Sequence, residues 1–368
     1  MRLSKQDMGK AHELFFELLR ISTGAQQSLC KIYTDKDWEG AFRIANEQTI
    51  VGVLLSALEK IKEEGDDSLP SKPLLLQWIG MGQMVEVETK KLAEAGNTVV
   101  DYFHKNGFAC QILKGSSVGR YYPQPYRRSS GDIDIWLDGG RKKIYDFARA
   151  FDKEGRLYGV NYHHIHFHLL EDVHVEVHVW PSYLSSPLRN RRLQQFCKIH
   201  EPRKDKDMPS LAFDRVFIML HAYQHMCGHG VGLRQVMDYY YVLKQGFTDD
   251  DREDAVYWIK KLGMARFACG LMWVLRENFG LEKNYLLMEP NEKEGRFILR
   301  EIILTGNMGH FDQRHWGSTV TPLSRFFLNL RRDVYLAKHY PHEALWQPFF
   351  SLWLYIWRWS EGLLGNDE

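Results

Sequence analysis

The stretch FACQILKGSSVGRYYPQPYRRSSGDIDIWL, residues 108–137, decides the fold of this chain. It opens with a short apolar run that stops at Gly115-Ser116, and near its end two isoleucines alternate with Asp132 and Asp134. Side chains along a strand alternate between its two faces. The alternation therefore predicts a half-buried strand that carries both aspartates on one face.

Two more alternating stretches follow this strand. They begin near His163 and are joined at Glu171-Asp172, a pair of residues that suits a hairpin turn. In the second stretch, alternate valines share one face, while Glu176 and His178 share the other. The sequence therefore predicts a β-hairpin with a carboxylate on its polar face.

Apolar residues at helical spacing dominate on both sides of these strands. The last helix before them, roughly residues 75–106, ends at Gly107, a residue suited to a helix C-cap. We therefore predict an α+β chain in which a small mixed sheet is flanked by helices. Its expected regions are an N-terminal helical region (1–106), an α/β core (107–186) and a C-terminal helical domain (187–368).

Composition narrows the class of protein. The 368 residues include 48 basic and 47 acidic side chains, a formal charge of +1, so no global attraction to nucleic acid or to an anionic membrane is expected. Five scattered cysteines without a C-x-x-C pair fit a reducing compartment. The first 21 residues lack the apolar run of a signal peptide. We expect a soluble, cytoplasmic protein that does not bind membranes, with a nucleic acid partner disfavoured.

An aromatic-rich segment, residues 345–357, stands near the end of the chain. It is too short to span a bilayer comfortably and is interrupted by Gln347 and Pro348. We expect it to form a helix that packs against the rest of the protein; association with a membrane surface is the alternative.

The carboxylates are suited to metal chemistry. Two aspartates on one strand face offer hard oxygen ligands, which Mg²⁺ prefers together with phosphate oxygens. Glu176 on a neighbouring strand would complete a two-metal clamp. The Gly115-Ser116 turn would let backbone N–H groups approach phosphate oxygens closely. Taken singly these signals are weak, but their order along the chain is specific.

Three motifs carry a resemblance to a known family: L-K-G-S-S at 113–117, R-x-x-G-D-I-D-I at 128–135 and V-E-V-H-V-W at 175–180. They resemble the polymerase-beta-type nucleotidyltransferase superfamily. Within it, the chain is similar to a bacterial branch usually labelled uncharacterised nucleotidyltransferase. The branch shares the tyrosine- and proline-containing loop, the Arg four residues before the first Asp, and a later His-rich helix followed by Arg and Asp. In this chain the later residues are His221, His225, His229, Arg234 and Asp238.

One departure from the superfamily pattern lies between the first two motifs. The gap from Gly115-Ser116 to Asp132 is longer than the commonest spacing, although it is ordinary for this branch. It leaves room for an altered phosphate site.

The resemblance implies transfer of a nucleoside monophosphate from a nucleoside triphosphate such as ATP to an acceptor hydroxyl, with release of pyrophosphate and dependence on Mg²⁺ or Mn²⁺. Asp132 and Asp134 would bridge metal and triphosphate. Glu176 would ligate the catalytic metal and accept the hydroxyl proton. The acceptor would be a small molecule or a protein side chain.

The resemblance also implies residues that bind the substrates. Gly115 and Ser116 would hold the terminal phosphates, and Lys114 and Arg128 would clamp them. Arg127 is adjacent to Arg128, so at most one of the two is expected to point inward, and the other would be a solvated surface residue. The residues expected to line the acceptor pocket are His178, His225, Arg234 and Asp238.

Plainer interpretations stay open at this stage. Asp132 and Asp134 could form the solvent face of an edge strand, and Arg234 with Asp238 could be a helix-surface pair. Histidines cluster on the hairpin, where His166 with His168, or His174 with His178, share a face and could bind zinc. The alternative function is a non-catalytic nucleotide-binding or partner-binding module that keeps the same fold.

Overall fold

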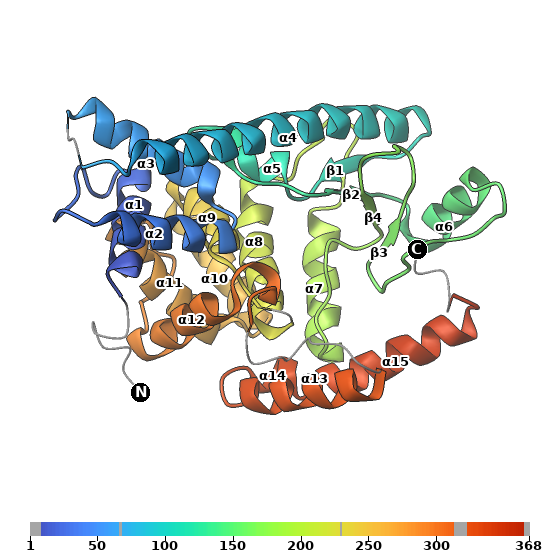
Figure 1. Ribbon diagram of the computed structural model, residues 1–368. Helices are drawn as coiled ribbons and strands as arrows, with labels where there is room; N and C mark the ends of the chain where they lie inside the picture. The colour runs from blue at the N-terminus through green and yellow to red at the C-terminus, as the bar shows by residue number, and fades with distance from the viewer. Residues whose placement is uncertain (1–8, 66–67, 229, 313–321, 364–368) are drawn as a thin grey trace.

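A computed structural model describes residues 9–65, 68–228, 230–312 and 322–363 (Figure 1). Helices build the N-terminal part, as expected. The last of them ends where the sequence predicts, because Gly107 adopts a positive φ of 81° after the final turn. The helices are α1 (Lys10–Thr23), α2 (Asp35–Glu47), α3 (Val51–Glu63) and α4 (Lys72–Lys105).

A four-stranded mixed sheet follows α4. Its spatial order is β1-β2-β4-β3; β2 and β4 are parallel neighbours, while β1 and β3 run antiparallel to them at the two edges. The bounds of the strands are β1 (Cys110–Ile112), β2 (Ile133–Leu137), β3 (His164–His166) and β4 (Val175–His178). The predicted α+β class is confirmed.

Short helices occupy the connections between the strands. The long gap between the first two motifs folds as α5 (Ser116–Gly119) and η1 (Pro125–Arg127), and α6 (Gly140–Phe151) follows β2. The predicted hairpin turn is confirmed, because a bridge between Leu170 and Val173 encloses Glu171 and Asp172.

The two faces of the sheet have different neighbours. On one face Ile133, Ile135, Val175 and Val177 are buried in a hydrophobic cluster with α4 and α6. On the other, Trp136 stacks on a phenylalanine of α8 and belongs to the large helical core. The polar side chains of β2 and β4 therefore lie on the face that looks toward the C-terminal helices.

The C-terminal helices pack on this second face and on the N-terminal helices. Gln48, which follows α2, accepts a hydrogen bond from the Leu233 backbone and donates one to the Ile302 carbonyl, so the two helical parts share one core. The bounds are α7 (Pro187–Ile199), α8 (Leu211–Cys227), α9 (Leu233–Lys244), α10 (Asp249–Lys261), α11 (Ala265–Phe279), η2 (Lys283–Tyr285), α12 (Glu292–Thr305) and η3 (Asn307–Gly309).

The last helices, α13 (Pro322–Leu336), α14 (Pro341–Ala344) and α15 (Gln347–Ser360), cross one side of the molecule beside α7 and the sheet (Figure 1). The expected packing of the aromatic segment is confirmed for one face of α15, where Phe350 stacks on Tyr183 at 4.8 Å between ring centroids. Its other face exposes Phe349, Leu352 and Trp359. Within the described ranges, no helix combines the length and apolar character needed to cross a membrane.

Candidate active site

Two predicted acidic residues meet on the central strands. In the parallel register of β2 and β4, Asp134 stands directly opposite Glu176. Residues paired in this way have their side chains on the same face of the sheet. Asp132 comes two positions before Asp134, immediately ahead of β2, and lines the same cavity as Glu176.

His178 connects the two strands. Its Nε2 lies 2.9 Å from Asp134 Oδ1 and 3.5 Å from Glu176 Oε2. The neighbouring strand β3 adds His164, whose Nδ1 is 3.2 Å from Glu176 Oε2. Burial lowers the pKa of His178, but its hydrogen bonds to the two carboxylates outweigh this and raise the pKa to about 9. His178 is therefore cationic at neutral pH and holds both carboxylates in place.

Lys114 supplies a second positive charge. Its Nζ lies 2.7 Å from Asp134 Oδ1, and the Asp134 side chain is 1% exposed. Burial alone would raise the pKa of Asp134, but the Lys114 ammonium and the His178 hydrogen bond together hold it below its usual value. Asp134 is therefore ionised at neutral pH even though water does not reach it.

The donor set fits a divalent cation. Carboxylate oxygens of Asp134 and Glu176 lie within 4.8 Å of each other, and Asp134 Oδ2 is buried without a hydrogen-bond partner among the described residues. A buried carboxylate oxygen normally has a partner, and hard oxygens are the preferred ligands of Mg²⁺. Repulsion by the Asp134 carboxylate, with partial burial, raises the pKa of Asp132. A cation bound between the two aspartates would relieve this repulsion.

The glycine turn lies next to the carboxylates. Gly115 has a φ of 61°, which favours glycine, and a Cβ at this position would approach Ser130 Oγ to 3.1 Å. Gly115 lines the same cavity as Asp132, and Ser116 lines a smaller hollow beside it. A residue larger than glycine at this position would therefore crowd Ser130 beside the carboxylates.

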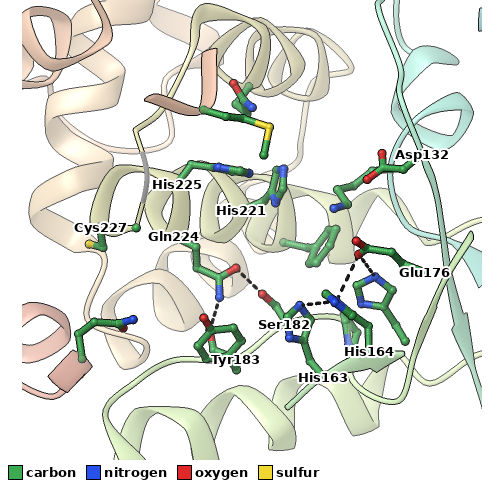
Figure 2. A pocket seen from close by; sticks show the side chains of 18 of the residues that line it. Asp132, His163, His164, Glu176, Ser182, Tyr183, His221, Gln224, His225 and Cys227 are labelled. Atoms are coloured by element: carbon green, nitrogen blue, oxygen red, sulfur yellow. Dashed lines mark hydrogen bonds and ion pairs between the residues drawn. The ribbon is translucent and has the colours of Figure 1, made fainter. Parts of the chain in front are cut away.

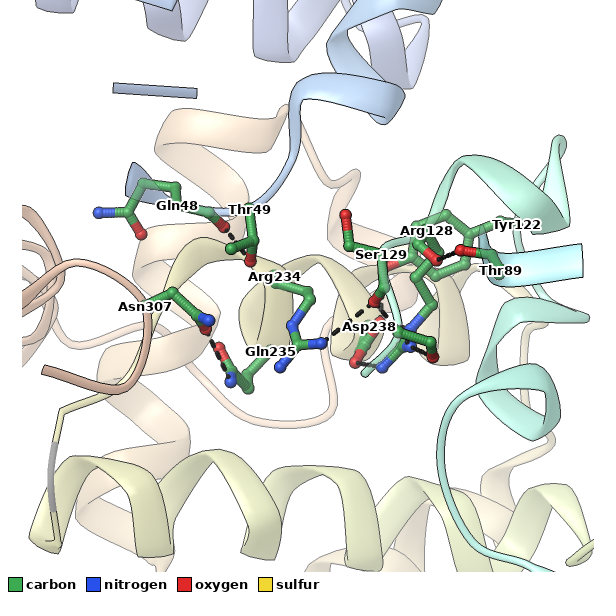
Figure 3. A network of polar contacts seen from close by, with 11 residues as sticks. Gln48, Thr49, Thr89, Tyr122, Arg128, Ser129, Arg234, Gln235, Asp238 and Asn307 are labelled. Atoms are coloured by element: carbon green, nitrogen blue, oxygen red, sulfur yellow. Dashed lines mark hydrogen bonds and ion pairs between the residues drawn. The ribbon is translucent and has the colours of Figure 1, made fainter. Parts of the chain in front are cut away.

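Arg128 is held by a buried ion pair that the sequence did not predict. Its Nε and Nη2 donate to the two carboxylate oxygens of Asp238 at 2.6 and 2.7 Å, and the Tyr122 hydroxyl donates to the same carboxylate at 2.6 Å (Figure 3). The interpretation of Arg234 and Asp238 as a helix-surface pair is wrong, because Asp238 is buried and bonds Arg128 from a different part of the chain.

Arg234 keeps donors available. Its Nη1 donates to the Ser129 carbonyl at 3.1 Å, while its Nε has no hydrogen-bond partner among the described residues (Figure 3). Arg127 differs from the expected solvated residue: its side chain is only 12% exposed and forms ion pairs with Glu59 of α3 and Glu86 of α4. The carboxylates of Glu59 and Glu86 therefore hold the Arg127 guanidinium away from solvent.

Most of these groups border one cavity of about 400 Å³ between the sheet, α8 and the last helices (Figure 2). Figure 2 shows Asp132 and Glu176 on one side of it and the α8 residues His221, Gln224 and His225 on another. Of the predicted site residues, those that line the cavity are Lys114, Gly115, Arg128, Asp132, Glu176, His178, His225, Arg234 and Asp238. Asp134 lies just behind, bonded to Lys114 and His178.

The histidine clusters differ in part from the zinc arrangements considered from the sequence. Two groups bring ligand atoms within reach of one ion: His163 with His164 and His178, and His164 with His166 and Glu176. Neither His168 nor His174 belongs to such a group among the described residues. Burial lowers the pKa of His163, and it lowers that of His164 to about 3, so both are neutral.

The histidine-rich helix ends as its glycines suggested. α8 stops at Cys227, and Gly228 follows it. His221 and His225 project from this helix with ring centroids 4.4 Å apart, and His225 lines the cavity. His229 lies outside the described residues.

Sequence reasoning did not find part of the cavity wall. Ser182 donates a short hydrogen bond to Gln224, and Gln224 donates another to the Tyr183 carbonyl (Figure 2). Asp333 of α13 and Gln347 of α15 also line the cavity. One contribution had a local signal in the sequence. The register of the predicted hairpin pairs His164 with His178, which places His164 at the site.

Comparison with known proteins gives one match. Residues 34–280, more than half of the chain, match the family described as "Uncharacterised nucleotidyltransferase". No curated protein and no solved structure matches the chain. The matched range includes the sheet, α8 and α9, which supply the carboxylates, Lys114 and Arg234.

Proposed function

This chain belongs to the uncharacterised nucleotidyltransferase family, and we propose that it transfers a nucleoside monophosphate from a nucleoside triphosphate to an acceptor hydroxyl in a metal-dependent reaction. The acceptor oxygen attacks the α-phosphorus, the bond between that phosphorus and the bridging oxygen breaks, and pyrophosphate leaves. The hydroxyl proton passes to Glu176 or to solvent.

The observation that carries this proposal is that Asp132 and Glu176 line one cavity with the Gly115 turn, while Asp134 stands opposite Glu176 on the neighbouring strand. These three carboxylates would hold Mg²⁺ or Mn²⁺. When bound, the metal would steady the phosphates and lower the pKa of the attacking hydroxyl. His178 and Lys114 keep Asp134 ionised and correctly oriented, so the ligand set is preorganised.

We expect the phosphates to bind at the part of the cavity that is lined by Lys114, the Gly115 turn and Arg234. The backbone N–H groups at Gly115 and Ser116 are suited to phosphate oxygens, with Lys114 as a nearby cation. Because Arg128 already makes a bidentate pair with Asp238, it is better placed to fix the Ser129 loop than to bind phosphate. Arg234, which keeps unpaired N–H donors, is the stronger arginine candidate.

The alternative is a module that binds nucleotide without turnover. It would keep the same carboxylates and the same metal-dependent affinity but would release no pyrophosphate. The release of pyrophosphate together with a labelled product therefore distinguishes the two functions.

The test uses the full chain with α-labelled triphosphates, Mg²⁺ and a cell extract as the source of acceptor. Wild type is expected to release pyrophosphate and to label an acceptor. Asp134→Asn and Glu176→Gln each remove one metal-binding charge and should lower the rate about 10²-fold or more.

Asp172→Asn, at the exposed hairpin turn, makes the same chemical change as Asp134→Asn away from the cavity and should keep full activity. Thermal unfolding of each variant checks that it folds. Unchanged turnover in both Asp134→Asn and Glu176→Gln would refute the proposal, and metal-dependent binding without turnover would support the non-catalytic module.

A further inference from the structure

The cavity has a second wall that the proposed reaction does not yet use. It is formed by α8, α13 and α15, and it includes Gln224, Asn329, Asp333, Gln347 and Ser351. Residues of α13 and α15 line this side of the cavity, so an acceptor bound in it would contact both helices. A cavity of about 400 Å³ has the size of a small-molecule site.

Asp333 is the unusual residue of this wall. The residue is 7% exposed and lines the cavity, and among the described residues its carboxylate has a charge interaction with Arg332 but no hydrogen bond. A buried carboxylate without a hydrogen-bond partner is costly, and natural proteins rarely keep one. Burial raises the pKa of Asp333 to about 7, with the Arg332 charge opposing the shift and the Glu343 carboxylate adding to it. A ligand group that supplies positive charge or hydrogen-bond donors would remove this cost.

The adjacent cation does not satisfy Asp333. Arg332 also lines the cavity, but its Nη2 donates to the Met226 carbonyl at 3.0 Å. The charge of Arg332 lowers the pKa of Asp333, but no hydrogen bond between the two side chains is found among the described residues. The carboxylate therefore faces the cavity with its hydrogen-bonding capacity unused.

Charge divides the cavity into two parts. Lys114 and Arg234 stand with the Gly115 turn on the wall that suits a triphosphate. A carboxylate on the opposite wall would repel phosphate and attract a cation. Apart from Arg332, the polar residues of α13 and α15 that line this wall, Asn329, Gln347 and Ser351, are neutral and suit hydroxyl groups.

We propose that the acceptor is a small hydroxyl-bearing molecule that carries a protonated amino group, and that Asp333 binds this group. The proposal rests on the proposed function, because it names the acceptor of the same reaction. Anchoring the amine at Asp333 would leave a hydroxyl of the molecule directed toward Asp132 and Glu176, and it would exclude long nucleic acid and folded proteins as acceptors.

The test measures binding of simple probes to the full chain loaded with Mg²⁺ and a non-hydrolysable triphosphate. Glucosamine and spermidine serve as amine probes, and glucose is the neutral counterpart of glucosamine. Calorimetry is carried out up to about 20 mM, well above the millimolar dissociation constants typical of weak small ligands. Glucosamine is expected to bind more tightly than glucose.

Three variants locate the interaction. Asp333→Asn should weaken glucosamine binding about tenfold or more, Asp333→Glu should retain it, and Asp250→Asn on the exposed face of α10 should leave it unchanged. Equal binding of glucosamine and glucose, no binding of either amine probe, or amine binding that survives Asp333→Asn would each overturn the inference.

Triphosphate binding is measured in the same samples. If the triphosphate binds with Mg²⁺ and neither amine probe does, only the inference about the acceptor fails. If the triphosphate itself does not bind, the proposed function fails first.

Discussion

Asp134 and Glu176 stand opposite each other on parallel strands, and one histidine, His178, contacts both carboxylates. The contact with His178 explains how acidic groups that are far apart in sequence are kept close despite their mutual repulsion. His178 and Lys114 contribute two positive charges against three carboxylates, so the site retains negative charge that a divalent cation can neutralise.

Replacing Lys114 should destabilise the metal-free protein in particular. Lys114→Met removes the ammonium that pairs with buried Asp134, at a cost on the order of 3 kcal/mol. We expect a lower melting temperature without metal and a larger rise on adding Mg²⁺ than wild type shows, because the cation restores the missing charge. Differential scanning fluorimetry with and without Mg²⁺ measures both effects.

Lys142→Met is the control for this experiment, since Lys142 forms an exposed helix-surface pair with Asp146. It should leave both melting temperatures unchanged. Equal effects of Mg²⁺ on wild type and Lys114→Met would contradict the assignment of the cation to these carboxylates.

The ion pair between Arg128 and Asp238 should stabilise the packing of the loop before β2 against α9. Asp238→Asn leaves a buried guanidinium without its partner and should lower the free energy of unfolding by about 3–5 kcal/mol. Replacing both residues, as Arg128→Met with Asp238→Leu, should cost less than the sum of the single changes. Urea unfolding of wild type, Arg128→Met, Asp238→Leu and the double variant gives the coupling energy, and strict additivity would argue against the pair.

Asp214 should make stability fall as pH rises. Burial raises its pKa to about 6, although Arg120 and Tyr121 bond its carboxylate. The native state then holds a proton that the unfolded chain releases near pH 4, so this group stabilises the fold below about pH 4 and its contribution is lost between about pH 4 and 6.

The size of this effect follows from the shift of the pKa. Relative to Asp214→Asn, wild type should lose about 3 kcal/mol of unfolding free energy across the window. Chemical unfolding from pH 4 to 7.5 measures the difference, and the exposed Asp250→Asn variant should follow wild type. Parallel curves for wild type and Asp214→Asn would show that the carboxylate has an ordinary pKa.

The histidine cluster should not hold stoichiometric zinc. His178 is already engaged by Asp134 and Glu176, which are hard ligands suited to Mg²⁺. Elemental analysis of protein purified without chelator should therefore find zinc well below one ion per chain. Stoichiometric zinc that disappears in His164→Ala would instead favour a transition-metal site formed with His163.

Several elements could be read from local pattern. The alternation around Ile133 and Ile135 gave the central strand with its acidic face, and Glu171-Asp172 gave the hairpin turn. Gly107 marked the end of α4. Each of these features is determined by residues that are close together in the sequence, so each can be predicted from a short stretch of it.

The partners of individual side chains depended on the tertiary structure. Arg128 bonds Asp238, 110 positions away, instead of pointing freely into the cavity, and Arg127 is drawn to Glu59 and Glu86. Asp333 lines the cavity because α13 packs against the end of α8, where Arg332 donates a hydrogen bond to the Met226 carbonyl. By itself the sequence determined the strand periods, the turn and the acidic motifs, because these follow from backbone geometry. Which charges became neutralised, and which remained available for a ligand, was decided by the packing of distant helices, since burial and ion pairing are properties of the folded chain alone.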